Sequence, residues 1–372
     1  MFLSRLYCRG FRPKAVETRE SKFAEFDSRE VFKYDSDVKW FPHHMARAKV
    51  AIPKKLPIVD LVVEVRDARI PLTSAQFELD ELIRLRPGRH RIVVLNKADL
   101  VQRQRTKDAV SLLELQGTPV LTTSALRETN INEVMRFISE NVEVRFKSLG
   151  ITVMVAGLPN TGKSTLLNAM RSFVKNPSLD KAPAKISGIP GSTQQVGMIQ
   201  ISAHHPKIYV LDTPGVMITK SALSHEDNSG DDVMMKLAAV GCIPDTVAGI
   251  SHVADYILFT LNIAREFKYV DVFNLSSPSN DISKVIGGVA RHINQGSSRI
   301  DHHAGTLKFI HMFREGKLGK LVLDELPNPD SVLKALEKET KFQFQTEPPG
   351  PWGPEKYPID NLVSRSIYKS RV

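Results

Sequence analysis

The sequence predicts an α/β fold: a doubly wound, mostly parallel sheet of six strands, followed by a C-terminal all-helical domain. Apolar runs of strand length alternate with helix-length segments through residues 58–211, which is the pattern of a parallel sheet covered by crossover helices. The alternation then stops, and apolar residues recur at helical spacing. Four short polar runs each follow a predicted strand directly, and such runs gather at the rim of a parallel sheet where ligands bind.

The predicted strands are runs rich in valine, isoleucine and leucine, which suit strands buried on both faces of a sheet. They span residues 58–65, 91–95, 119–123 and 151–156. Two closely spaced runs, 196–202 and 207–211, predict a hairpin and therefore an antiparallel edge. Apolar residues three and four positions apart predict helices over 75–86, 103–115, 131–146 and 165–170.

Helical spacing continues in the second half, over residues 233–240, 247–267, 282–293, 305–313 and 331–338. We therefore expect five parts in the chain. They are a leader (1–20), an N-terminal extension (21–57), the α/β domain (58–220), the helical domain (221–346) and a flexible, proline-rich tail (347–372).

Composition narrows the class of protein. The 372 residues carry a net charge of +10, which favours a polyanionic partner such as nucleic acid. The two cysteines form no C-x-x-C pair, so the sequence excludes a disulfide framework and a structural zinc site. The leader contains Arg5, Arg9, Arg12 and Lys14 with no acidic residue before Glu17. It is typical of a mitochondrial transit peptide, and a basic disordered arm is the alternative.

A phosphate-binding loop follows the strand at 151–156. Gly157–Ser164 reads GLPNTGKS, a G-x-x-x-x-G-K-S pattern between a strand and a helix. Loop amides and the helix N-terminus bind phosphate oxygens, Lys163 reaches the β- and γ-phosphates, and the Ser164 hydroxyl binds Mg²⁺. The predicted nucleotide-binding residues of this loop are Asn160, Thr161, Gly162, Lys163, Ser164 and Thr165.

The base-recognition residues are predicted after two other strands. Asn96-Lys97-Ala98-Asp99 is an N-K-x-D run, in which the Asp99 carboxylate can accept two hydrogen bonds from guanine. Adenine lacks those donors and would leave the carboxylate unpaired, which favours guanine. Asn96 holds the loop, Lys97 can lie across the base, and the backbone amides of Ser124 and Ala125 can meet the base oxygen.

A D-x-x-G run at 212–215 follows the last strand of the hairpin. Asp212 is predicted to contact Mg²⁺ and the Gly215 amide to meet the γ-phosphate. Thr193, in a Gly-Ser-Thr stretch between the phosphate-loop helix and the hairpin, is the candidate for the second Mg²⁺ hydroxyl and a γ-phosphate switch. A plain turn is the other reading of that stretch.

The order of these motifs is permuted. Guanine-nucleotide switches usually present the phosphate loop first and N-K-x-D later, whereas here N-K-x-D and the Ser124-Ala125 run come first. Compact domains tolerate such permutation because their chain ends often lie close together. The D-x-x-G run then continues straight into the helical domain, so nucleotide state is expected to reposition that domain.

With this order, Trp40–Met45 (WFPHHM) and Asp67–Pro71 (DARIP), the sequence resembles the mitochondrial branch of the YlqF/RbgA family of circularly permuted GTPases over about residues 38–324. The resemblance implies a ribosome-biogenesis GTPase that binds GTP, GDP and Mg²⁺, acts on the mitochondrial large ribosomal subunit, and is stimulated by it. A matrix location, peripheral contact with the inner membrane and a monomeric state belong to the same expectation.

The resemblance also implies catalytic residues. Val216 stands where many GTPases have a glutamine that orients water, and the family assigns this role to the histidine before methionine in its Trp-Phe-Pro-Gly-His-Met run. That histidine is His44, beside His43 in place of glycine. Lys163 and Gly215 complete the predicted catalytic set, and Asn160 matches a K⁺-coordinating asparagine.

The helical domain is basic at 287–320, where Asp301 and Glu315 are the only acids, and is predicted to bind RNA phosphates. Its cations include Arg291, Arg299, Lys308, Arg314, Lys317 and Lys320. A solvated face is the alternative. For the whole protein, two other functions stay open: a GTP-dependent scaffold on mitochondrial rRNA that does not hydrolyse GTP, and a small-molecule kinase.

Overall fold

The structure is a computed structural model of the chain, and it describes residues 23, 25–34, 53, 55–76, 79, 82–83, 90–115, 117–142, 150–174, 197–202, 206–213, 229–293, 301–329 and 331–333. The predicted leader, the segment that carries His43 and His44, and the tail lie outside this description. So do Thr193, Gly215 and Val216. The predicted domain limits at 20, 220 and 346 fall among these residues as well and stay predictions.

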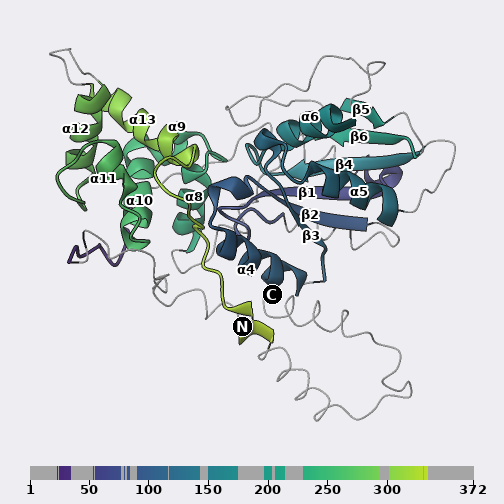
Figure 1. The fold of residues 1–372 in the computed structure, drawn as a ribbon, viewed down its shortest axis with the longest axis horizontal. Coiled ribbons are helices and arrows are strands. Elements are labelled where there is room, and N and C mark those ends of the chain that lie inside the picture. Colours follow the sequence, from purple (N-terminus) through teal and green to yellow (C-terminus); the bar gives the residue numbers. More distant parts are fainter. Residues whose placement is uncertain are drawn as a thin grey trace, which may run out of the picture.

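A single six-stranded sheet forms one half of the molecule (Figure 1). Its spatial order is β3 (Val120–Thr122), β2 (His90–Asn96), β1 (Leu61–Asp67), β4 (Ile151–Gly157), β6 (Ile208–Asp212) and β5 (Gly197–Ser202). All neighbours pair in parallel except β5 and β6, which pair antiparallel. The predicted doubly wound sheet with one antiparallel edge is therefore confirmed.

The strand register brings three loops to one rim of this sheet. β1 lies in the centre between β2 and β4, with Asp67 opposite Asn96 and Val65 opposite Gly157. Parallel strands end at the same edge. The phosphate loop after β4, the N-K-x-D run after β2 and the DARIP segment after β1 therefore start side by side.

Helices cover both faces of the sheet because its strands carry apolar residues on both sides. On β2, Ile92 and Val94 pack with α5 (Ile131–Asn141) and α6 (Lys163–Val174). Val93 and Leu95 point the other way and pack with α4 (Arg103–Glu114). Next to α4 on that face, Leu79 packs on β1 and β4. Successive residues of a strand point to opposite faces, and helices bury both faces. Near-continuous apolar runs are therefore the sequences that suit these strands.

The helical half contains α8 (Ser229–Ala239), α9 (Asp245–Ala248), α10 (Ile250–Ile263), α11 (Lys268–Val272), α12 (Ile282–Ile293) and α13 (His302–Arg314). The single helix predicted over 247–267 is wrong, because two left-handed residues break it. Gly249, at φ +80°, separates α9 from α10. Arg265, at φ +55°, ends α10 in a turn whose next amide, that of Glu266, donates back to Leu261.

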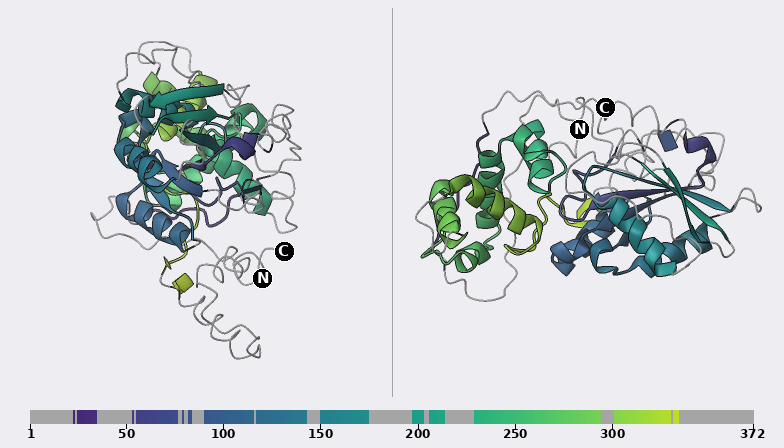
Figure 2. Two further views of the ribbon diagram at one scale, coloured as in Figure 1. Left: turned by 90° about the vertical axis from the view of Figure 1, so that its right-hand side faces the viewer. Right: turned by 90° about the horizontal axis from the view of Figure 1, so that it is seen from above.

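Two residues of the sheet half lie in the apolar core of the helical half. Ile70 of the DARIP segment and Leu158 of the phosphate loop are fully buried in the core of the helical half, together with α8, α10 and α13. The chain after α13 then returns to the sheet half (Figures 1 and 2), where the Leu323 amide donates to the Arg69 carbonyl oxygen at 2.7 Å. Helices therefore cover one side of the loops at the rim.

An N-terminal strap, residues 25–34, packs along α10. Its Phe32 lies edge-on to Tyr256 at 5.1 Å between ring centroids, and its Arg29 forms an ion pair with Asp255 at 2.8 Å. These contacts fix the strap to the helical half, just before the chain leaves the described residues at 35. Among the helices that the structure describes, none is long and apolar enough to cross a membrane.

Candidate nucleotide-binding site

Two glycines allow the phosphate loop to lie close to its neighbours. Gly157, at the end of β4, has φ +152°, and a Cβ there would sit 2.3 Å from the Val65 carbonyl oxygen. Gly162 has φ +95°, and a Cβ there would sit 2.2 Å from Nδ2 of Asn96. Each glycine is required by a different adjoining strand or loop. The two glycines of the G-x-x-x-x-G pattern are therefore needed for packing against the neighbouring strand and loop, in addition to any role in binding phosphate.

Asn96 joins the three recognition loops. Its side chain is 2% exposed; Nδ2 donates to the Thr161 carbonyl oxygen at 2.9 Å, and Oδ1 accepts from the Ala125 amide at 2.9 Å and from Thr123 Oγ1 at 3.3 Å. The predicted loop-holding role of Asn96 fits this geometry.

The amides predicted to meet the base oxygen have protein acceptors in this structure. The Ala125 amide donates to Asn96, and the Ser124 amide donates to the Thr129 carbonyl oxygen at 3.3 Å. The buried Ser124 Oγ has no hydrogen-bond partner among the described residues. A base at this corner would therefore share or replace existing contacts, and the role of both residues in base recognition stays a prediction.

Asp99, the predicted guanine-binding carboxylate, forms an ion pair with Arg127 at 3.0 Å. The Arg127 side chain is 65% exposed, so this pair contributes little to stability, and a guanine base can compete with it at low cost. Arg127 was missed by the sequence reasoning. The signal available was a cation two positions after the Ser124-Ala125 run.

Lys163 stands at the start of α6 and is 6% exposed. Its ammonium group donates to the Leu158 carbonyl oxygen at 2.8 Å, and Thr161 Oγ1 donates to the same oxygen at 2.9 Å. Burial lowers the pKa of Lys163 to about 8, and the opposing attraction of Asp212 only partly offsets this. A phosphate group placed here would favour the charged form and raise this pKa again.

Ser164 and Asp212 form the part of the site that could hold Mg²⁺. Ser164 Oγ donates to Asp212 Oδ2 at 3.2 Å, while the buried Asp212 Oδ1 has no hydrogen-bond partner among the described residues. Burial raises the pKa of Asp212, against the effects of Lys163 and Ser164. An orphaned carboxylate oxygen beside a hydroxyl is a fitting donor set for Mg²⁺, which takes few protein ligands and completes its shell with phosphates and water. Thr193, the other predicted ligand, lies outside the described residues.

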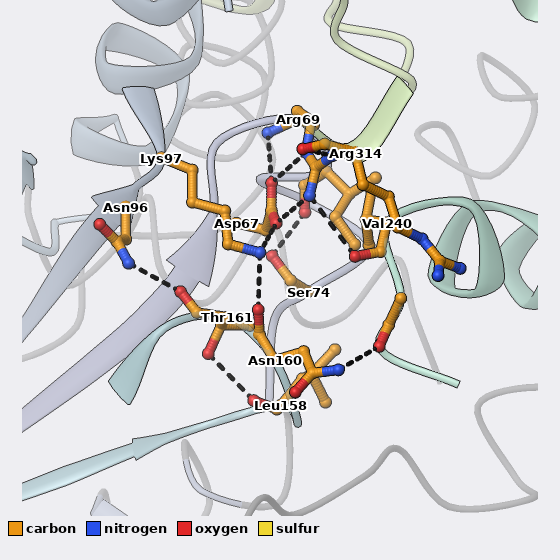
Figure 3. A network of polar contacts seen from close by, with 12 residues as sticks. Asp67, Arg69, Ser74, Asn96, Lys97, Leu158, Asn160, Thr161, Val240 and Arg314 are labelled. Carbon is orange, nitrogen blue, oxygen red and sulfur yellow. Dashed lines mark hydrogen bonds and ion pairs between the residues drawn. The ribbon is translucent and has the colours of Figure 1, made fainter. Parts of the chain in front are cut away.

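Lys97 and Asn160 contact partners that the sequence did not predict. Lys97 Nζ donates to Asp67 Oδ2 at 2.9 Å and to the Asn160 carbonyl oxygen at 2.6 Å (Figure 3). Asn160 Nδ2 donates to the Gly241 carbonyl oxygen at 2.7 Å, in the helical half. The proposed K⁺ ligand therefore also contacts the other domain.

Asp67 and Arg69 of the DARIP segment lie beside the nucleotide-binding site, and the sequence predicted no role for either. Both are almost completely buried, and Arg69 donates to both Asp67 carboxylate oxygens at 2.9 and 2.8 Å. Burial alone would raise the pKa of Asp67, but Arg69 and Lys97 outweigh it and hold that pKa well below its usual value. An Asp-x-Arg directly after a buried strand was the available signal.

Comparison with known proteins gives consistent results. A family model described as "50S ribosome-binding GTPase" matches residues 152–285. "Mitochondrial ribosome-associated GTPase 1" of Ictalurus punctatus is 33% identical, over 77% of this chain and 92% of that protein. Its namesake from Xenopus tropicalis is 32% identical, over 82% and 97%.

A bacterial relative extends the comparison. "Ribosome biogenesis GTPase A" of Bacillus cereus is 29% identical over 82% of this chain and 99% of that protein. The chain thus matches these relatives over almost their whole length, with N-K-x-D before the phosphate loop in its own sequence. The chain therefore belongs to the YlqF/RbgA family of circularly permuted GTPases, together with the mitochondrial ribosome-associated GTPases.

Proposed function

We propose that this protein is a GTP-hydrolysing assembly factor for the mitochondrial large ribosomal subunit, which it binds in the GTP state and leaves after hydrolysis. The observation that carries the proposal is the convergence, at one rim of the sheet, of the phosphate loop, Asp99 and the Ser164–Asp212 pair. The names of the mitochondrial and bacterial relatives support the ribosomal role.

The proposed nucleotide contacts combine the geometry of the described residues with the motifs of the sequence. Asp99, with Asn96, Lys97, Ser124 and Ala125 around it, would bind guanine, and the loop from Asn160 to Thr165 would bind the phosphates. Mg²⁺ would be held by Ser164, Thr193 and Asp212, and K⁺ by Asn160. Lys163 and the Gly215 amide would stabilise charge on the γ-phosphate. His44 would orient the attacking water, because the aliphatic Val216 cannot.

The proposed ribosome-binding surface is the exposed side of α12 and α13. Arg291 of α12 and Lys308 of α13 are exposed, as is Lys320 in the chain that follows α13, which supports contact with RNA phosphates. Arg314 has a different role from the one expected: it donates to the carbonyl oxygens of Ala238 and Ala239 and pairs with Asp245. It stabilises the helical half and is a poor candidate for RNA contact.

Guanine specificity is tested by competition. The purified wild-type protein should bind GDP and GTP far more tightly than ADP and ATP. Asp99→Asn should lose guanine affinity and gain affinity for xanthosine diphosphate, whose C2 oxygen can accept from the new amide. Equal affinity for ATP and GTP, or a GDP affinity unchanged by Asp99→Asn, would remove the guanine assignment.

The ribosomal role is tested by sedimentation and turnover. The protein should co-migrate with the purified mitochondrial large subunit in the presence of a non-hydrolysable GTP analogue, and not with GDP. Subunits should raise multiple-turnover GTP hydrolysis, and His44→Ala should lose most of that stimulation while still binding GDP. If subunits bind but stimulate nothing, and His44→Ala behaves as wild type, the protein is a non-hydrolysing scaffold instead.

Mitochondrial placement fits the family names and the basic leader, and we propose the matrix, with peripheral contact to the inner membrane, as the site of action. A fluorescent fusion should reach mitochondria only when residues 1–20 are present. Carbonate extraction should release the protein from mitochondrial membranes. Retention in the pellet would contradict peripheral association.

A further inference from the structure

The DARIP segment is connected to both nucleotide-recognition loops through Asp67 and Lys97. This carboxylate is fully buried and accepts from the Arg69 guanidinium, from the Arg69 amide at 3.0 Å and from Lys97 Nζ at 2.9 Å. Lys97 belongs to the N-K-x-D run and donates at the same time to the Asn160 carbonyl oxygen of the phosphate loop. Asp67 therefore holds Lys97, which joins the N-K-x-D run (the base loop) to the phosphate loop (Figure 3).

The other side of the same ion pair contacts the helical half. The Arg69 guanidinium donates to the carbonyl oxygens of Val240, directly after α8, and of Arg314, at the end of α13, at 3.5 and 3.4 Å. Carbonyl groups at helix C-termini carry partial negative charge, which a guanidinium complements. The Arg69 carbonyl oxygen also accepts from the Leu323 amide at 2.7 Å. Arg69 is thus bonded to three separate places in or beyond the helical half.

The Asp67–Arg69 ion pair at the centre of this network is costly to separate. Asp67 and Arg69 are buried, and separating a buried ion pair leaves an uncompensated charge, which is strongly unfavourable. A movement of α8 and α13 relative to β1 must therefore pull Arg69 from their carbonyl oxygens or from Asp67. The Arg69 nitrogen that donates to Val240 also donates to the Asp67 oxygen that Lys97 binds, so such a movement changes the environment of the Lys97 contact with the phosphate loop. The position of the helical half and the shape of the nucleotide site depend on the same few bonds.

We propose that Asp67 and Arg69 form a relay between the guanine-nucleotide site and the helical domain. Asp67 is the positioning residue for nucleotide binding, acting through Lys97, and Arg69 connects it to the ends of α8 and α13. The inference rests on the proposed guanine-nucleotide site and adds a route that does not pass through Thr193 or Gly215. Coupling through such a relay is reciprocal: nucleotide binding stabilises the helix ends, and loosening the helix ends weakens nucleotide binding.

Asp324 provides a matched control. It is also a buried acid, 5% exposed, and it also ties the two halves together. Its carboxylate accepts from the Leu72 and Thr73 amides at 2.7 and 2.9 Å and lies 3.7 Å from Lys236. None of these partners belongs to the base loop or the phosphate loop. Asp324→Asn therefore weakens the contact between the two halves but leaves the contacts of Asp67, Arg69 and Lys97 in place.

The test compares full-length wild type, Asp67→Asn and Asp324→Asn in GDP titrations, with thermal melting as the measure of stability. Asp67→Asn should raise the Kd for GDP at least tenfold, whereas Asp324→Asn should leave it within twofold even if both lower the Tm equally. Equal changes in Kd would overturn the relay. If the wild type itself binds no guanine nucleotide, the proposed function fails, and the inference fails with it for that separate reason.

A second measurement keeps the proposal falsifiable if Asp67→Asn does not fold. Hydrogen exchange at the C-terminal amides of α8 and α13 should slow when GDP binds to the wild type and to Asp324→Asn. Arg69→Lys keeps a cation beside Asp67 but cannot reach both carbonyl oxygens, so GDP should no longer slow exchange there. Slowing that persists in Arg69→Lys, or that is missing in the wild type, would contradict a relay through Arg69.

Discussion

Replacement of Asn96 by alanine tests how far the nucleotide site is preformed. The substitution removes three hydrogen bonds from a side chain that is 2% exposed: those to the Thr161 carbonyl oxygen, the Ala125 amide and the Thr123 hydroxyl. It leaves the buried Ala125 amide without the only acceptor it has in the described structure. The three loops would then lose the connection that sets their relative positions.

The magnitude follows from the lengths of these bonds. The two bonds of 2.9 Å are worth about 1 kcal/mol each, and an unpaired buried amide costs about 1 kcal/mol or more in addition. The total is about 3 kcal/mol. If nucleotide binding has to restore the loop arrangement at that cost, GDP affinity falls by about a hundredfold.

Fluorescent-nucleotide titration measures the loss, and Thr123→Val is the matched control. Thr123 is equally buried but contributes only the 3.3 Å bond, so its removal should change the GDP Kd by less than about threefold. A Kd for Asn96→Ala within threefold of the wild type would refute the idea that Asn96 preforms the site. So would equal effects of the two substitutions.

Three further outcomes are expected. Burial lowers the pKa of Lys163 to about 8 and bound phosphate should raise it, so GDP affinity should fall by about tenfold between pH 7 and 9 in titrations, and a flat profile would contradict the shift. Burial alone would raise the pKa of Glu64, but its paired arginines outweigh burial and lower that pKa from 4.5 to about 2. This shift contributes about 3 kcal/mol to the free energy of unfolding. The contribution is present above pH 4.5 and is lost as the pH falls toward 2. In urea unfolding, Glu64→Gln should therefore be less stable than wild type at pH 7, with a difference that shrinks below pH 4.5; a constant difference would argue against the ion pairs. Gly157→Ala should cost about 3 kcal/mol, because its Cβ collides with a carbonyl oxygen, whereas Gly117→Ala, with nothing within 4 Å, should cost about 1 kcal/mol by the same assay.

The sheet was predictable because the local sequence of each strand indicates that the strand is buried on both faces. β4 has a near-continuous apolar run followed by a glycine loop, and its observed bounds, Ile151–Gly157, extend the prediction by one residue. The same holds for Asn96, whose polar side chain directly after buried Leu95 indicates a role at the rim. Periodicity and motif spacing are short-range signals, and these features depend on short-range contacts.

The joint between the halves was not predictable for the opposite reason. Arg69 meets the carbonyl oxygens of Val240 and Arg314, and a backbone acceptor has no residue type that would mark it in a sequence. The break at Gly249 was missed because the apolar spacing continues through α9 and α10 as if they were one helix. A single glycine is tolerated inside a helix, so it gives no clear stop signal.

The return of the chain from α13 to the sheet has a consequence for the order in which the molecule can be completed during synthesis. Asp324 binds the Leu72 amide, 252 positions earlier in the chain. Ile70 and Leu158 lie in a core formed with helices that are made after them. Chains emerge from the ribosome at about 5–20 residues per second. In a nascent chain, the DARIP segment and the phosphate loop would therefore be present for many seconds before the helices that cover them have been synthesised. Premature termination before Ser229, where α8 begins, should therefore yield a sheet with an uncovered apolar rim rather than a smaller working enzyme.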